Sequence, residues 1–187
     1  NRAMYITRTN ATGAVAGELA VTYNDGTTLT SGLSILDGSY TVTDRYNGNW
    51  SVSNEGTAVS ASSYSLALIA QNAFVAGNGN SRIIAASAAI SGTHQNGTVT
   101  PGAQRTAVTQ ADLLAGPFYI GISSSDIPNT ALASGNWNDP TIWNKGNAPT
   151  CSDPVSIPSG IDVTVNTTGN VAKGINILAG GTLTVTS

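Results

Sequence analysis

The stretch Val15-Ala-Gly-Glu-Leu-Ala-Val-Thr-Tyr23 places an apolar residue or a glycine at every second position. This alternation is the period of a β-strand with one buried face. Asn24-Asp25-Gly26 follows and predicts a turn, after which a second strand is expected over 29–35. Asp37-Gly38 predicts another turn before a strand over 40–42. The opening of the chain therefore predicts two consecutive β-hairpins.

The same pattern of short strands and turns continues as far as residue 122. Short apolar strands, bounded by Gly, Asn and Ser, are predicted around Trp50–Val52, Tyr64–Ile69, Arg82–Ile84 and Phe118–Ile122. A single helical turn over 109–114 is the only helix expected, with Thr109 as its N-terminal cap. Recurrent short strands without a long amphipathic helix predict an antiparallel β-sandwich over residues 1–127.

The remainder, residues 128–187, has a different composition. Five of the seven prolines lie between Pro128 and Pro158. The segment Ser134–Gly146 carries Trp137 and Trp143 on either side of an Asn-Asp-Pro turn, which predicts a compact plug at the end of a sheet. We therefore expect a domain boundary near residue 127, followed by a Trp/Pro-rich connector.

Short alternating Val/Ile strands follow the connector, two of them opened by glycine at a constant offset. They are predicted at Val155–Ile157, Gly160–Val165, Gly174–Ile177 and Gly181–Thr186. Ile161 and Val163 recur as Ile175 and Ile177 at one constant offset. Short strands with glycine at the corners are typical of a β-solenoid, in which each layer leaves a face for its neighbour. The sequence predicts the start of β-solenoid-like repeats or a strand-rich segment.

Charged residues are scarce: they make up 9% of the chain, against roughly 25% in an ordinary soluble domain. Seven Lys and Arg against ten Asp and Glu give a net charge of -3, so the chain has no basic surface for nucleic acid. No apolar run approaches the roughly 20 residues of a membrane span, which excludes membrane insertion. Thr, Ser, Asn and Gly dominate the rest of the chain, a neutral polar composition that favours a secreted or cell-surface location.

The sequence offers no local set of catalytic residues. The ten acids are scattered singly, whereas two-carboxylate hydrolysis needs paired acids. His94 lies in a Gly/Asn-rich loop without an acidic neighbour, and the lone Cys151 excludes an internal disulfide. We therefore predict that the chain is not an enzyme and needs no cofactor. A structural calcium ion stays open as an alternative at turn residues such as Asp25, Asp37 and Asp139.

Four aromatic residues are candidates for glycan binding: Tyr46, Trp50, Trp137 and Trp143. Exposed rings beside Asn and Asp can stack on sugar, which is the basis of the alternative function, a carbohydrate-binding module. The other interpretation is that these rings fill the cores of small β domains.

The second segment resembles the β-solenoid-type repeats of large secreted proteins of Bacteroidota. The resemblance rests on Gly-Asn-Trp-Asn-Asp-Pro-x-x-Trp (135–143), on Val155–Val165 and on Ile177–Val185, and it covers Ser134 to Ser187. Residues 1–126 are more loosely similar to the sandwich modules that precede such repeats, through 45–50, 92–94 and 118–121. The resemblance implies export by the type IX secretion system and a role in adhesion, gliding or matrix architecture. It implies no catalytic residues, and the chain departs from it by lacking a recognisable C-terminal sorting domain.

The scarcity of lysine also indicates which partners the chain can bind. Sheet edges are commonly protected from pairing with other chains by lysines, and this chain has only Lys145 and Lys173. Low charge also weakens repulsion between copies. We therefore expect a structural or adhesive module that associates with copies of itself, or with neighbouring modules of the same polypeptide, into a fibre or surface layer.

Overall fold

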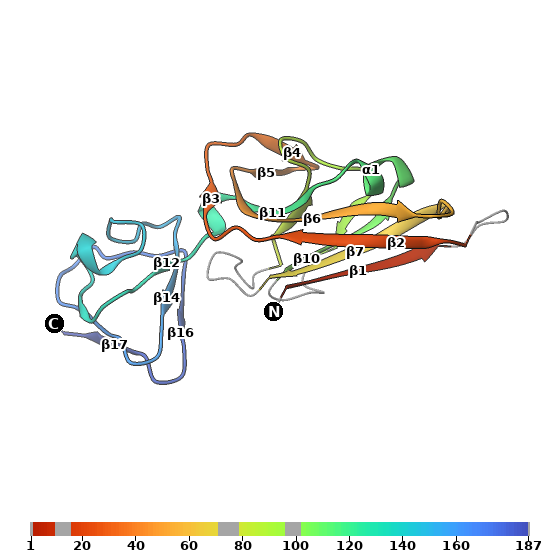
Figure 1. Cartoon of the computed structure of the whole chain (residues 1–187). Coiled ribbons are helices and arrows are strands. Elements are labelled where there is room, and N and C mark those ends of the chain that lie inside the picture. The colour runs from red at the N-terminus through yellow and green to blue at the C-terminus, as the bar shows by residue number, and fades with distance from the viewer. Residues whose placement is uncertain (1, 10–15, 71–78, 96–101, 187) are drawn as a thin grey trace. The chain divides into compact units, whose positions relative to one another are not determined.

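A computed structural model of the chain describes residues 2–9, 16–70, 79–95 and 102–186. The chain forms two compact units, Asn1–Ser124 and Ser125–Ser187, so the division falls just before the position expected from the sequence. Both units are built mainly from strands, with one short α-helix among the described residues (Figure 1). The all-β prediction is confirmed.

The first unit is an antiparallel sandwich of two sheets. One sheet has the order β1-β7-β10-β9, with strands β1 (Arg2–Thr9), β7 (Ser63–Ala70), β10 (Gly102–Val108) and β9 (Thr93–Gln95). The other has the order β2-β6-β11-β8, with β3 also on β6; its strands are β2 (Glu18–Asn24), β3 (Leu29–Thr30), β6 (Asp44–Glu55), β11 (Phe118–Ile122) and β8 (Arg82–Ile84). A hairpin of β4 (Ile35–Asp37) and β5 (Tyr40–Val42) and the helix α1 (Gln110–Ala115) complete the unit.

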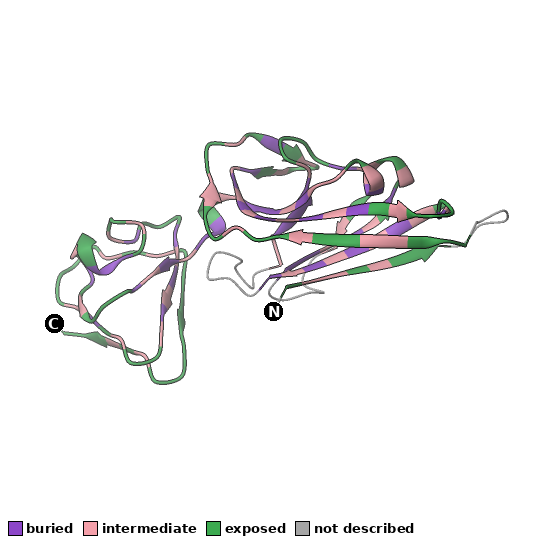
Figure 2. Cartoon of the chain, in the orientation of Figure 1, coloured by how far each residue is buried: buried purple, intermediate pink, exposed green. Residues whose placement is uncertain are grey.

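The core lies between these sheets because their central strands alternate strictly. In β7, Tyr64, Leu66, Leu68 and Ala70 are buried while the residues between them are half-buried (Figure 2). In β6 every second residue from Asp44 to Val52 is buried in the same way. Period-two burial on two facing strands is the packing that defines a sandwich.

The first predicted hairpin is wrong. Strands β2 and β3 do not pair with each other: β2 pairs with 49–55 of β6 and β3 with 45–46, both antiparallel. The other edge of β6 is occupied by β11, so β2 and β3 follow one another along a single edge. Strand β6 is long enough to hold both, and Asn24-Asp25-Gly26 interrupts the strand without reversing it. The second predicted hairpin is confirmed, with Gly38 at φ 63° in its turn.

The predicted helix is also confirmed. Helix α1 begins after Thr109, whose hydroxyl oxygen accepts a hydrogen bond from the Asp112 backbone N–H at 3.2 Å. The Asp112 carboxylate in turn accepts from the Ser91 backbone N–H at 2.7 Å. The hydrogen bonds from Ser91 lower the pKa of Asp112, so this carboxylate is charged at neutral pH and ties the helix to the loop before β9.

A buried ion cluster joins the β4–β5 hairpin to β10. Arg105 is 3% exposed and donates two hydrogen bonds to the Asp37 carboxylate, at 2.8 and 2.9 Å. Arg82 Nε lies 3.3 Å from the same carboxylate, and its guanidinium lies over the Tyr40 ring. These contacts fix the hairpin on the sandwich.

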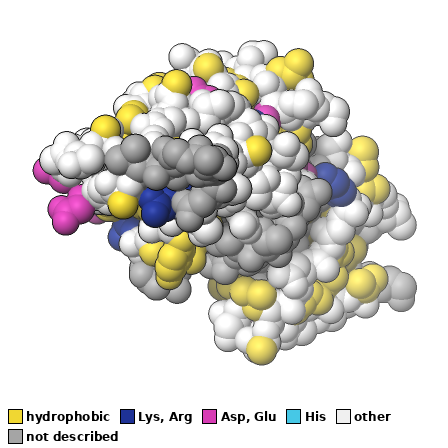
Figure 3. Space-filling view, turned by 90° about the vertical axis from the view of Figure 1, so that its right-hand side faces the viewer, with side chains coloured by type: hydrophobic (Ala, Val, Ile, Leu, Met, Phe, Trp, Pro, Cys, Tyr) yellow, Lys and Arg dark blue, Asp and Glu magenta, His cyan; other side chains and the backbone are white. Residues whose placement is uncertain are grey.

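Part of the small number of charged residues lies inside the fold and not at the surface. Several charged residues are buried among the described ones, namely Asp44, Arg82, Arg105, Asp126 and Asp153. On the face in Figure 3, charged side chains form only a few separate spots among other side chains. Charges held inside the fold cannot protect strand edges at the surface. The chain therefore uses part of its small set of charges to position its own segments.

The second unit consists of two parallel three-stranded sheets. One has the order β12-β14-β16 and the other β13-β15-β17; the strands are β12 (Asn129–Thr130), β13 (Gly135–Asn136), β14 (Pro154–Ile157), β15 (Asp162–Val165), β16 (Gly174–Ile177) and β17 (Thr182–Val185). Two short 3-10 helices are also present: Ser124–Asp126 begins at the last residue of the first unit, and Pro140–Ile142 lies within the second. Within the described residues neither unit closes into a barrel, and the second is the strand-rich segment of the prediction rather than a solenoid.

The strand positions in the second unit agree with the sequence, but the predicted repeat offset is wrong. Val155 lies opposite Ile175 and Val163 opposite Leu183, and these pairs define the step from one layer to the next. The corners stack with the same offset, since Gly160 N–H donates to the Gly180 carbonyl at 2.8 Å. The shorter recurrence seen in the sequence compares β15 with β16, which belong to different sheets.

None of the helices in the described part of the chain is long and apolar enough to cross a membrane.

We predict that Asp37→Ala destabilises the first unit by about 3–5 kcal/mol, because it leaves two buried guanidinium groups without their counterion. The matched control is Asp25→Ala, which removes an exposed partner of Arg2 and should cost less than about 1 kcal/mol. Urea denaturation followed by circular dichroism measures both. Equal losses of unfolding free energy in the two variants would contradict a stabilising role for Asp37 in the buried ion cluster.

Candidate functional site: the open end of the second unit

The first layer of the second unit is capped by the segment 137–144. Leu132 N–H donates to the Ile142 carbonyl at 2.7 Å and Asn144 N–H to the Thr130 carbonyl at 3.0 Å. A bridge between Ala131 and Trp143 lies between these two bonds. The edge of β12 that does not face β14 is therefore paired.

The two tryptophans of this cap pack edge to face, with ring centroids 5.3 Å apart, and Trp143 Nε1 donates to the Trp137 carbonyl at 2.9 Å. Both rings lie in the core of the second unit with Ile142 and Val155. The plug expected from the sequence is thus confirmed at the outer edge of β12.

The opposite end has no such cap among the described residues. Strands β16 and β17 are the last members of their sheets. Val155 and Ile157 of β14 are 2% and 0% exposed, whereas their register partners Ile175 and Ile177 in β16 are 46% and 44% exposed. The side chains are of the same kind at equivalent positions, so the difference marks the face that another layer would cover.

An apolar hollow of about 200 Å³ lies at this end. Its lining includes Trp137, Val171, Ile175, Leu183 and Val185. Trp137 Nε1 is buried and has no hydrogen-bond acceptor among the described residues. A buried donor without an acceptor costs free energy, so the interior at this end is incomplete in both packing and hydrogen bonding. We call β16, β17 and this hollow the open end.

The open end carries no charge. The segment 174–186 contains no Asp, Glu, Lys, Arg or Pro. The nearest cation in the sequence, Lys173, is placed 3.1 Å from the Asp126 carboxylate. The devices that usually protect a strand edge, namely charges and prolines, are therefore missing from both strands.

Asp153 anchors the chain just before β14. Its carboxylate accepts from Lys145 Nζ at 2.7 Å, from Thr150 N–H at 2.9 Å and from the Thr150 hydroxyl at 2.6 Å. Its carbonyl accepts from Lys173 N–H at 2.9 Å, which links it to the start of β16. Burial acts to raise the pKa of Asp153, but the hydrogen bonds from Lys145 and Thr150 outweigh it and the pKa is lowered.

The four aromatic residues proposed for glycan binding occupy two separate cores. Tyr46 and Trp50 are buried in the sandwich, and Trp137 and Trp143 in the second unit. Each is at most 2% exposed. The open aromatic face that sugar stacking requires is therefore not formed by these four rings.

The structure brings His94 closer to an acid than the sequence suggests. His94 and Asp37 line one hollow together with Arg82. The Asp37 carboxylate is already engaged by Arg82 and Arg105, however, and His94 Nε2 lies 3.0 Å from the Gly79 carbonyl. These contacts are those of a structural cluster. Cys151 is exposed.

The turn acids considered for calcium have local partners. Asp25 accepts from Gly26 N–H at 3.0 Å, and Asp139 accepts from Thr141 N–H at 2.9 Å. In the described part of the chain, no three His, Cys, Asp or Glu side chains are grouped to hold a metal ion. The hydrogen bonds explain why short acids occupy these turns.

Comparison with known proteins returns no match to any family model, curated protein or solved structure.

We predict that Asp153→Asn destabilises the second unit by about 1.5–3 kcal/mol at neutral pH, because hydrogen bonds to a charged group are lost or weakened. Since the folded state lowers the pKa of Asp153 below its ordinary value of 3.8, this stabilisation is present above that value and disappears as the pH falls through the lowered pKa. The difference between the two proteins should therefore shrink in acid. Urea denaturation at several pH values tests this, with exposed Asp162→Asn as control. A difference in the free energy of unfolding between the native chain and Asp153→Asn that does not change with pH would contradict the stabilising role of the charged Asp153 carboxylate.

Proposed function

We propose that this chain is a non-catalytic structural or adhesive module that pairs with a second copy of itself through the open end. The observation that carries the proposal is the contrast between the buried Val155 and Ile157 and their exposed counterparts Ile175 and Ile177. A face that is covered in one layer and bare in the next has the chemistry of an interface. Its natural complement is another uncharged strand edge with branched apolar residues.

A second copy supplies such an edge. Because 174–186 has no charged residue, two open ends meet without like-charge repulsion. A two-fold rotation would set β16 and β17 against the same strands of the partner, which is the self-complementary geometry of most dimers. The two hollows would then form one continuous apolar interior.

The cap limits how the assembly can grow. The paired edge of β12 cannot receive an open end from another copy, so this unit supports a closed pair instead of a head-to-tail stack. A fibre or surface layer would require a second contact on each copy.

A secreted or cell-surface setting is part of the proposal. It is supported by the neutral Ser/Thr/Asn-rich composition and the low charge. Export by type IX secretion in a Bacteroidota protein stays a prediction that rests on the resemblance of 134–187 alone.

Sedimentation velocity over a roughly hundredfold concentration range tests the pairing. We predict that the chain dimerises, and that Ile177→Lys weakens the dimer by about 100-fold or more, because it places two like charges across the two-fold axis in an apolar contact. Leu132→Lys is the matched control, since Leu132 is an exposed leucine of the same unit outside the open end, and it should leave the dimer intact.

Circular dichroism of each variant separates loss of pairing from loss of fold. A native chain that stays monomeric over the whole range, or a dimer that Ile177→Lys leaves unchanged, would contradict the proposal.

A further inference from the structure

A second feature, independent of the open end, lies at one side of the sandwich. The edge strands β1 and β2 belong to different sheets and do not pair with each other. Between them lies a groove of about 370 Å³, a volume within the usual range of small-molecule sites. Four apolar side chains line it, Met4 and Ile6 from β1 and Leu19 and Val21 from β2.

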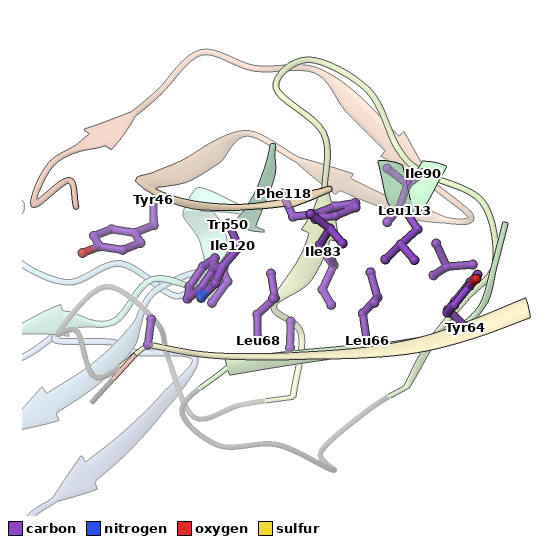
Figure 4. Close-up of a cluster of buried hydrophobic side chains, with 14 of the residues drawn as sticks. Tyr46, Trp50, Tyr64, Leu66, Leu68, Ile83, Ile90, Leu113, Phe118 and Ile120 are labelled. Carbon is purple, nitrogen blue, oxygen red and sulfur yellow. The ribbon is translucent and has the colours of Figure 1, made fainter. Parts of the chain in front are cut away.

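The inner end of the groove carries an unusual polar group. Tyr64 lines the groove and is 1% exposed, yet its hydroxyl is buried without a hydrogen-bond partner among the described residues. Figure 4 shows Tyr64 at one end of the row of core side chains, with its hydroxyl turned away from Leu66. Buried hydroxyls normally find a partner, so this one is an unsatisfied donor on a residue that lines the groove.

A cation lies beside that hydroxyl. Arg8 is directly opposite Tyr64 in the β1–β7 register, which puts both side chains on the same face of the sheet, and Arg8 also lines the groove. Burial raises the pKa of Tyr64 while the charge of Arg8 acts in the opposite direction. The hydroxyl is therefore protonated at neutral pH and acts as a donor.

We propose that the groove binds the free anion of a single-chain carboxylic acid, with its hydrocarbon tail between β1 and β2 and its carboxylate at Tyr64 and Arg8. Four apolar side chains match a tail, and a neutral donor next to a cation matches a carboxylate. The ligand is taken as a free monomer, because a groove between two strand edges accommodates one chain rather than a bilayer surface.

Calorimetric titration of the whole chain with decanoate tests the proposal. Affinity should rise about fourfold for each methylene added from hexanoate to decanoate, the value expected for burial of a methylene. Decanol, which has the same tail without the charge, should bind more weakly. Vesicles of a zwitterionic phospholipid should not bind, and retention on them without decanoate binding would overturn the free-acid assignment.

Two variants assign the carboxylate. Tyr64→Phe should weaken decanoate binding by about tenfold or more, yet it should not lower the stability of the unliganded chain, because the hydroxyl has no partner to lose among the described residues. Arg8→Gln should weaken decanoate and leave decanol unchanged. Tyr5→Phe, on the outward face of the same strand, is the matched control.

The proposal fails if decanoate does not bind at millimolar concentration. It fails equally if Tyr64→Phe binds decanoate as tightly as the native chain.

Discussion

Unpaired strand edges are the constraint on which this structure depends. Each strand presents backbone N–H and C=O groups along both edges, and these must be paired, covered or left to water. In the first unit β6 has β2 and β3 along one edge and β11 along the other. In the second unit the segment around Trp143 pairs the edge of β12, while β16 is left as the outermost strand. Among the described residues both units leave strand edges unpaired, at β1 and β2 in the first unit and at β16 and β17 in the second.

Alternation and turn residues predict much of the fold because they report local chemistry. The burial pattern of β7 repeats the alternation of its sequence, and Thr109 and Gly38 occupy the cap and the turn that their residue types favour. Strand β10 is not predicted, for two physical reasons. Arg105 points inward, which breaks the apolar pattern, and a bulge follows it with Ala107 at φ 56°. A buried charge and a bulge both depend on distant partners that local sequence does not reveal.

The pairing partner of each strand is the other feature that the sequence does not predict. The sequence cannot show that β2 and β3 share an edge of β6, because that depends on the length of a strand further along the chain. The layer spacing of the second unit is detectable. Val155–Val165 and Ile175–Val185 align from end to end without a gap. In this alignment a glycine lies opposite a glycine at the corner, and a valine lies opposite a valine at the end of the second strand. The sequence cannot reveal whether an aromatic ring is exposed, since an aromatic residue beside asparagine occurs both in sugar-binding sites and in protein cores.

Exposure of an apolar side chain is informative only together with the face it occupies. Tyr5 is exposed singly, and such residues are ordinary at protein surfaces. Ile175 and Ile177 are different, because their register partners one layer earlier are buried. Val21 of β2 is 45% exposed and yet lines the groove beside the buried Tyr64. In both places an inward-facing apolar residue stays exposed because none of the described strands covers it. The exposure of an inward residue therefore has to be read together with the chemistry around it, which is uncharged at the open end and includes a buried hydroxyl at Tyr64.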